Sequence, residues 1–303
     1  MTLSPTSDTM NAMKKYHLDN FFIDSPKIYG NVSLYQIGAL HCNADTVINT
    51  HRQGNYFELT VITDGKGFIS ADGKTAAVKK NDIFVSYPFE THKIQPDPDD
   101  PIFFHYLAFS VSDPETGGML QRIAHEYSSA AERVLQSEPL SAALAAAINE
   151  FSSDMVLSRE YRTALLTEIT VLLIRGFSAR NTRYRKPDRN EEFVYQIMNY
   201  INTHILSMRS LFELCDAFGY EYSRISKIFS SVTGKTLESY FRARRFQTAL
   251  SLLNENLKVG EVAYMLNYSS VYSFSKAFKQ YFGFSPKQSK SANSRSEARQ
   301  RPM

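Results

Sequence analysis

The chain has few of the features that would tie it to a membrane or to an oxidising compartment. Its 303 residues include two cysteines, Cys42 and Cys215, which lie far apart in the sequence. Two such cysteines cannot form a disulfide framework or a thiolate metal site, and they fit a reducing compartment. No apolar run approaches the roughly 18 residues of a membrane span, and residues 1–20 lack the apolar core of a secretory signal. We therefore predict a cytoplasmic protein without a membrane partner.

The net charge of +3 is small, but it is unevenly distributed. Residues 191–303 contain 15 Lys and Arg against 9 Asp and Glu, whereas residues 1–190 carry a net charge of −3. Between the two parts, residues 178–190 hold five basic side chains, one acid and no apolar periodicity, which is typical of a solvated linker. The basic part predicts a polyanionic partner, although a solvated surface would explain the charge equally well.

The N-terminal part alternates between short β-rich runs and turns. Strands are predicted at residues 57–63, 67–71, 76–78, 83–87 and 102–109. The Asp-Gly pairs at 64–65 and 72–73 predict hairpins, because type I′ turns need positive φ at both central residues. Evenly spaced short strands with turn signals indicate a small barrel or sandwich.

Three amphipathic helices are predicted to follow these strands, at residues 118–131, 140–157 and 159–177. The third carries an apolar stripe with a spacing of three and four residues, formed by Leu165, Leu166, Ile169, Leu172 and Leu173. This stripe either packs onto its own domain or forms an association surface. We predict a homodimer that uses residues 159–177.

The C-terminal part contains an internal repeat. The pattern Ser226-Lys-x-Phe229 recurs as Ser275-Lys-x-Phe278 at an offset of 49 residues, and Gly219-Tyr220 recurs as Asn267-Tyr268 at an offset of 48. Each copy has an apolar-periodic helix, a break at a residue that tolerates the left-handed conformation, and a second amphipathic helix. Such a unit is a helix-turn-helix.

The second helix of each copy turns hydroxyl and cationic side chains away from its apolar face. Cations neutralise DNA phosphates, and Ser, Lys and Arg can donate to base edges in a major groove. Residues 237–253 between the copies are long enough for a helix of about 25 Å. Such a spacer could hold the two readers roughly one DNA turn, ~34 Å, apart.

The C-terminal motifs resemble the AraC/XylS family of transcription regulators. They are Gly219-Tyr220, Ser226-Lys227-x-Phe229, Arg245-Phe246-x-x-Ala249-x-x-Leu252-Leu253 and Phe282-Gly283-Phe284-Ser285-Pro286. The resemblance implies two helix-turn-helix units in adjacent major grooves of promoter DNA, and RNA polymerase as a partner if the protein is an activator. Together with the outward faces, it predicts DNA contacts from Ser223, Arg224, Ser226, Lys227, Val271, Tyr272, Ser275 and Lys276.

The N-terminal motifs resemble the cupin-type effector domain found in many such regulators. They are His51-x-x-x-x-Tyr56-Phe57-Glu58-Leu59, Asp82-Ile-Phe84 and Pro88-x-x-x-His92. The resemblance implies a small-molecule effector, for which His51, Glu58, Tyr87 and His92 are the candidate contacts.

A metal at this site is the alternative to a metal-free pocket or to plain structural hydrogen bonding. His51, Glu58 and His92 occupy positions where a catalytic cupin carries its ligands, but Gln53 stands where a second histidine would be expected. Three protein ligands can suffice for a catalytic metal. We nevertheless predict no metal, no cofactor and no catalytic residue.

These observations predict an α+β protein of two domains, a cupin-like β-barrel with trailing helices followed by an all-α double helix-turn-helix. The predicted boundaries are a disordered tail at 1–16, an effector-binding and dimerisation domain at 17–177, a basic linker at 178–190, a DNA-binding domain at 191–291 and a disordered tail at 292–303. The predicted function is sequence-specific DNA binding by a transcription regulator that responds to an effector. The alternatives are a cupin-type metalloenzyme tethered to DNA by its basic domain, and a chromosome-compacting protein that does not read sequence.

Overall fold

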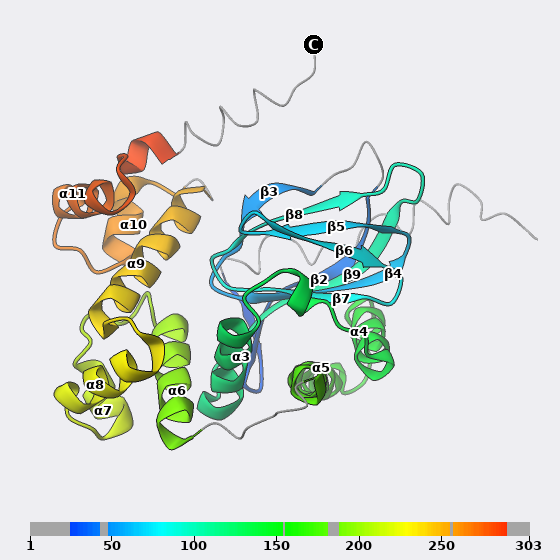
Figure 1. Cartoon of the computed structure of the whole chain (residues 1–303), viewed down its shortest axis with the longest axis horizontal. Helices are drawn as coiled ribbons and strands as arrows, with labels where there is room; N and C mark the ends of the chain where they lie inside the picture. Colours follow the sequence, from blue (N-terminus) through cyan, green and yellow to red (C-terminus); the bar gives the residue numbers. More distant parts are fainter. Residues whose placement is uncertain (1–24, 43–47, 154, 181–187, 255–256, 290–303) are drawn as a thin grey trace, which may run out of the picture. The chain divides into compact units, whose positions relative to one another are not determined.

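The computed structural model describes residues 25–42, 48–153, 155–180, 188–254 and 257–289 (Figure 1). The chain divides into two compact units, Met1–Lys186 and Pro187–Met303. The tails predicted at 1–16 and 292–303 lie outside the described residues, as do residues 181–187 of the predicted linker. The described ends of that linker region belong to helices, because one helix continues to Arg180 and the next begins at Arg189.

The first unit contains two antiparallel sheets. The five-stranded sheet has, in spatial order, β1 (Lys27–Tyr29), β2 (Val32–Cys42), β9 (Ile102–Val111), β4 (Phe57–Asp64) and β7 (Ile83–Ser86). The four-stranded sheet has β3 (Ile48–Arg52), β8 (Thr91–Pro96), β5 (Lys66–Ala71) and β6 (Lys74–Lys79). The predicted β-rich domain is confirmed. Among the described residues no ladder joins the two sheets, so they pack together without closing into one barrel.

The two Asp-Gly pairs have different roles in these sheets. Asp72 and Gly73 both have positive φ, 44° and 78°, and connect the paired strands β5 and β6. At the other pair only Gly65 has positive φ, and the turn leads from β4 in one sheet to β5 in the other. A Cβ atom on Gly65 would lie 1.8 Å from the carbonyl oxygen of Pro101, so this glycine allows a close backbone approach. The hairpin predicted at residues 64–65 is therefore wrong, and the one at 72–73 is confirmed.

Three α-helices and a 3-10 turn complete the first unit: α3 (Pro114–Glu126), η1 (Ala131–Arg133), α4 (Glu138–Phe151) and α5 (Ser158–Arg180). They cover one face of the five-stranded sheet (Figure 1). Strand alternation divides the buried side chains between two clusters. In β4, Phe57, Leu59 and Val61 pack toward the helices, whereas Ile62 belongs to the cluster that includes residues of the other sheet.

The apolar stripe of α5 is part of the core of its own unit. Leu166, Ile169 and Leu173 are completely buried, and Leu165 is 5% exposed. Of the two alternatives for this stripe, the structure supports packing within the domain. The prediction that the stripe forms a dimer interface is wrong, because its side chains are already covered by the same chain.

The second unit is all-helical, with α6 (Arg189–Thr203), α7 (Glu213–Phe218), α8 (Tyr222–Thr233), α9 (Leu237–Asn254), α10 (Val259–Met265) and α11 (Val271–Phe282). Two small cores lie along α9. Leu237 and Phe241 belong to the core with α6 and α8, whereas Phe246 and Leu253 belong to the core with α10 and α11. One continuous helix therefore joins the two halves of the predicted repeat.

Both copies of the repeat contain the predicted left-handed residue between their helices. Gly219 has φ 70° and Asn267 has φ 57°. Asn267 keeps this conformation with a hydrogen bond from its Nδ2 to the carbonyl oxygen of Leu206, at 2.9 Å. The double helix-turn-helix is confirmed. No helix in the described ranges is long and apolar enough to cross a bilayer.

Candidate nucleic-acid interface and effector site

The second helix of each repeat, α8 or α11, has one buried face and one outward face that carries no acidic side chain. Each helix has 12 residues and contains no Asp or Glu. Ile225 and Phe229 anchor α8, and Phe274 and Phe278 anchor α11, all four with no exposed surface. Because residues four apart share a helix face, the opposite faces of both helices are turned to solvent.

The eight predicted DNA contacts lie on these outward faces. On α8, Ser223, Arg224 and Lys227 are exposed and Ser226 is half-buried. Arg224 stacks over the ring of Tyr220, with its Cζ 4.3 Å from the ring centroid. This contact holds the guanidinium at the start of the helix.

The outward face of α11 combines large and charged side chains. Tyr272 is 78% exposed and Val271 is 48% exposed, Lys276 is exposed, and Ser275 is half-buried. The hydroxyl of Ser270 caps the helix by accepting from the backbone N–H of Ser273, at 3.1 Å. The first turn of α11, which carries Val271 and Tyr272, is thereby held in helical geometry.

Arg245 has a structural role. Its guanidinium donates to the carbonyl oxygen of Leu266 and lies 4.5 Å from the ring centroid of Tyr268. Burial lowers the pKa of Arg245. Arg245 thus connects α9 to the turn of the second helix-turn-helix.

In the first unit, the structure brings together two of the four predicted effector contacts. The side chains of Glu58 on β4 and His92 on β8 are almost fully buried, and Oε1 of Glu58 lies 3.5 Å from Nε2 of His92. The backbone of His51 is paired with that of His92 in the β3–β8 ladder, but the side chain of His51 lies outside the described part of the structure. Glu58 and His92 therefore link one sheet to the other.

Tyr87 does not belong to this pair. Its hydroxyl donates to the carbonyl oxygens of Ile123 and Tyr127, at 3.3 and 3.1 Å, and its ring packs in the core beneath the helices. The guanidinium of Arg133 lies 3.9 Å from the ring centroid and forms a buried ion pair with Glu90, at 2.5 Å. Tyr87 thus positions the end of α3.

Tyr106 adds a third polar group to the Glu58–His92 pair. Burial raises the pKa of Tyr106, and the nearby Glu58 carboxylate raises it further. Burial alone would lower the pKa of His92, but the Glu58 and Glu90 carboxylates raise it overall and favour the imidazolium. Gln53 is 1% exposed, and its Nε2 has no hydrogen-bond partner among the described residues.

One buried feature near the site could not be found from the sequence. The Glu90–Arg133 ion pair joins residues 43 positions apart, and no motif marks it. Tyr106, on β9, is one of two tyrosines that the sequence offered as possible ligand-stacking residues, with packing as the alternative. Among the described residues, no group of three His, Cys, Asp or Glu side chains could hold a metal ion.

Comparisons with known proteins assign a domain to each unit. Residues 34–170 match the model of an AraC-like ligand-binding domain, and residues 214–292 match that of a helix-turn-helix domain. The two matches define a class of protein in which a ligand-binding domain and a DNA-binding motif share one chain. The chain belongs to the AraC/XylS family of transcription regulators.

Similar individual proteins are regulators as well. The chain is 30% identical over 130 residues to the xylose operon regulatory protein of Escherichia coli K12. This match covers 43% of this chain and 33% of that protein. It is also 20% identical over 260 residues to the uncharacterized regulator YfiF of Bacillus subtilis, a match that covers 82% of this chain and 80% of that protein. The structure of ToxT from Vibrio cholerae aligns with 84% of this chain and 96% of that one, at 14% identity and a TM-score of 0.44. The chain matches about a third of the length of the first curated relatives.

Proposed function

We propose that this protein is a sequence-specific DNA-binding transcription regulator, and that a small molecule bound in its N-terminal domain controls its affinity for promoter DNA. The observation that carries the proposal is the pair of acid-free helices, α8 and α11, on a common helix α9. A surface that avoids acids and exposes cations and hydroxyls suits the phosphates and base edges of DNA.

The two helices have different side chains for the two tasks of DNA recognition. Lys227 and Lys276 can donate to guanine O6 and N7, while Ser226 and Ser275 can donate to or accept from base edges. Tyr272 and Val271 offer apolar contact with a thymine methyl group. The 18 residues of α9 span about 27 Å, which suits two readers in consecutive major grooves.

In the N-terminal domain, the proposed effector contacts are Glu58 and His92, with Tyr106 as a third polar neighbour. Together they offer a carboxylate, an imidazole and a phenol, which suits a small polar molecule. Such an effector shifts the balance between the DNA-competent and DNA-incompetent states by the difference between its affinities for the two states. These groups serve recognition, and the proposal includes no catalytic step, no metal and no cofactor.

The proposal also includes protein partners. A second copy of the chain would bind through a surface other than the buried stripe of α5, and RNA polymerase would be a partner if the protein is an activator. Binding to promoter DNA would place the protein in the cytoplasm.

The proposal can be tested by selecting binding sites from a pool of random DNA with the full-length protein. A sequence-specific regulator enriches a motif and keeps its preference in excess bulk DNA. Retention of all sequences alike would contradict the proposal and favour a chromosome-compacting protein. Mapping the bound sites in the genome of the source organism would then indicate the regulated genes.

A further inference from the structure

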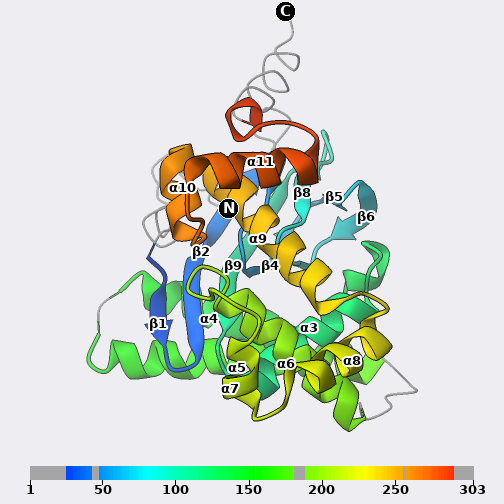
Figure 2. The ribbon, with the colours of Figure 1, turned by 90° about the vertical axis from the view of Figure 1, so that its left-hand side faces the viewer.

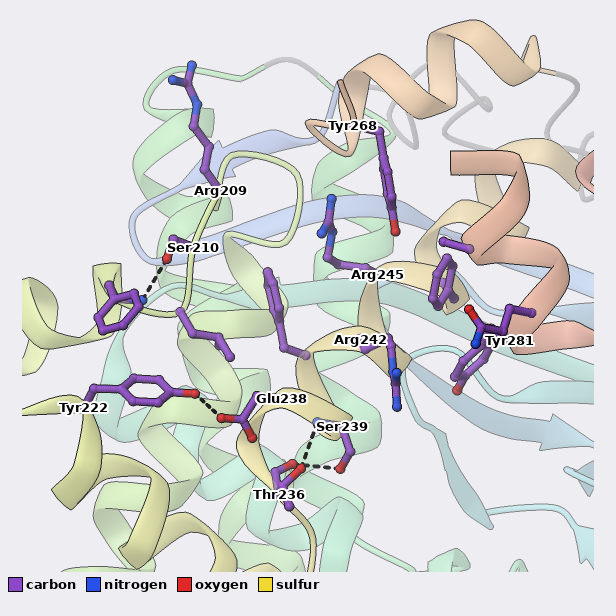
Figure 3. Close-up of a pocket in the computed structure, with 16 residues that line it drawn as sticks. Arg209, Ser210, Tyr222, Thr236, Glu238, Ser239, Arg242, Arg245, Tyr268 and Tyr281 are labelled. Atoms are coloured by element: carbon purple, nitrogen blue, oxygen red, sulfur yellow. Dashed lines mark hydrogen bonds between the residues drawn. The ribbon is translucent and has the colours of Figure 1, made fainter. Parts of the chain in front are cut away.

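A groove of about 870 Å³ lies along α9 in the second unit (Figure 3). The loop before α7 and the start of α8 line it at one end, and α11 lines it at the other. Figure 2 shows α9 running between α8 and α11. The groove therefore belongs to both helix-turn-helix units.

The groove is continuous with the two faces that we propose to read DNA. Tyr222 lines it and lies one turn before Ser226 on α8, and Gln280 lines it and lies one turn after Lys276 on α11. Residues four apart occupy the same side of a helix. If a DNA duplex contacted both Ser226 and Lys276, the phosphate backbone between its two major grooves would lie over this groove of the protein.

The charge of the groove is complementary to that backbone. Its lining includes three arginines, Arg209, Arg242 and Arg245, and one acid, Glu238. Arg245 is held by Leu266 and Tyr268, as described above. Arg209 and Arg242 are exposed, and neither forms an ion pair with another described residue.

The one acid in the groove is compensated within the protein. The carboxylate of Glu238 accepts a hydrogen bond from the hydroxyl of Tyr222, and this bond lowers the pKa of Glu238. Glu238 also lies in the first turn of α9, where the helix dipole favours a negative charge. Its main effect is therefore to hold Tyr222 at the edge of the groove.

Arg242 is the side chain best placed for a phosphate. It extends from the second turn of α9 into the groove, away from the Arg245–Tyr268 contact (Figure 3). Farther along the groove, Tyr281 of α11 stacks on Phe246 of α9, with ring centroids 4.8 Å apart. A guanidinium in such a position presents a fork of donors that matches the geometry of a phosphate.

We propose that this groove is a third DNA contact, in which Arg242 binds the phosphate backbone between the two major grooves read by α8 and α11. The contact carries no sequence information but fixes the register of both readers on the duplex. The proposal rests on the proposed function, because it presumes that both helices contact one DNA molecule.

The test combines a protein substitution with neutral DNA linkages in the full-length protein. Methylphosphonates replace the phosphates between the two read segments of the selected site, and binding is measured for the wild type, Arg242→Gln and Arg242→Lys. We expect the central neutral linkages to weaken the wild type and Arg242→Lys clearly, and Arg242→Gln much less. Arg242→Gln should also reduce the salt slope of binding by roughly 0.9.

Lys287→Gln is the matched control, because Lys287 is exposed in the same unit but does not line the groove. It should respond to the central linkages as the wild type does. If Arg242→Gln and the wild type lose the same affinity on neutralisation, the phosphate contact is refuted while the proposed function stands. If the wild type shows no sequence preference at all, both are refuted.

Discussion

Lys276 on α11 and Arg245 on α9 differ in how far the protein itself engages their cationic groups. Lys276 is exposed on α11, two residues after the buried Phe274, and no acid on its own helix competes for it. Arg245, by contrast, is engaged with Leu266 and Tyr268. Lys276 is therefore free to reach a base edge.

Lys276→Ala is expected to cost roughly 1–3 kcal/mol of binding free energy and to relax the preference at one base pair, if Lys276 donates to a guanine. Binding to a panel of single-base variants of the selected site at two salt concentrations measures both effects. Equal weakening across the panel would show that Lys276 meets a phosphate, and specificity would then rest on Tyr272, Ser275 and α8.

The Glu58–His92 pair makes the stability of the N-terminal domain depend on pH. The pKa of His92 is raised in the folded state, so its stabilising effect is complete below the ordinary histidine value of about 6.5 and is lost as the pH rises through the folded-state pKa. The difference in unfolding free energy between the wild type and His92→Gln should be larger at pH 6 than at pH 8.5. Urea unfolding at both pH values measures it, and a difference independent of pH would argue against the ion pair.

At the level of elements, local patterns could be predicted and long-range pairings could not. The helices of the repeat follow from apolar spacing and from Gly219 and Asn267, all of which act within a few residues. The same Asp-Gly dipeptide makes a hairpin at Asp72 and a crossover between sheets at Asp64, because the approach of Pro101 to Gly65 decides the second case. The contact between Glu58 and His92 likewise depends on how two sheets pack.

The stripe of α5 provides a test at this scale. Replacing Leu166 and Leu173 with Asp should unfold the N-terminal domain, because two charges would be buried without partners, at a cost of several kcal/mol. Val171→Asp on the same helix is the control, since Val171 is 37% exposed and should tolerate the change. Circular dichroism and size-exclusion chromatography distinguish unfolding from dissociation. A folded monomeric double variant would restore the stripe as a dimer interface.

At the scale of the whole molecule, the proposed function means that one chain contacts two separate segments of DNA through α8 and α11, which are held in a fixed arrangement. Helix α9 contributes side chains to both C-terminal cores, so the two helix-turn-helix units cannot turn independently without breaking a core. The sequence preference for DNA should therefore appear as two patches of base pairs at a fixed distance, one patch for each helix-turn-helix unit. The effector would act on both patches together, because the helices that contact them, α8 and α11, belong to one unit of the protein.

The most direct measurement is the affinity of the full-length protein for its selected site and for every single-base variant of that site. We expect two patches of sensitive base pairs, with centres roughly one helical turn or ~34 Å apart, and an affinity that falls steeply as salt rises. Lys227→Ala should relax one patch and Lys276→Ala the other. A single patch, or an affinity that is the same for all variants, would contradict the account.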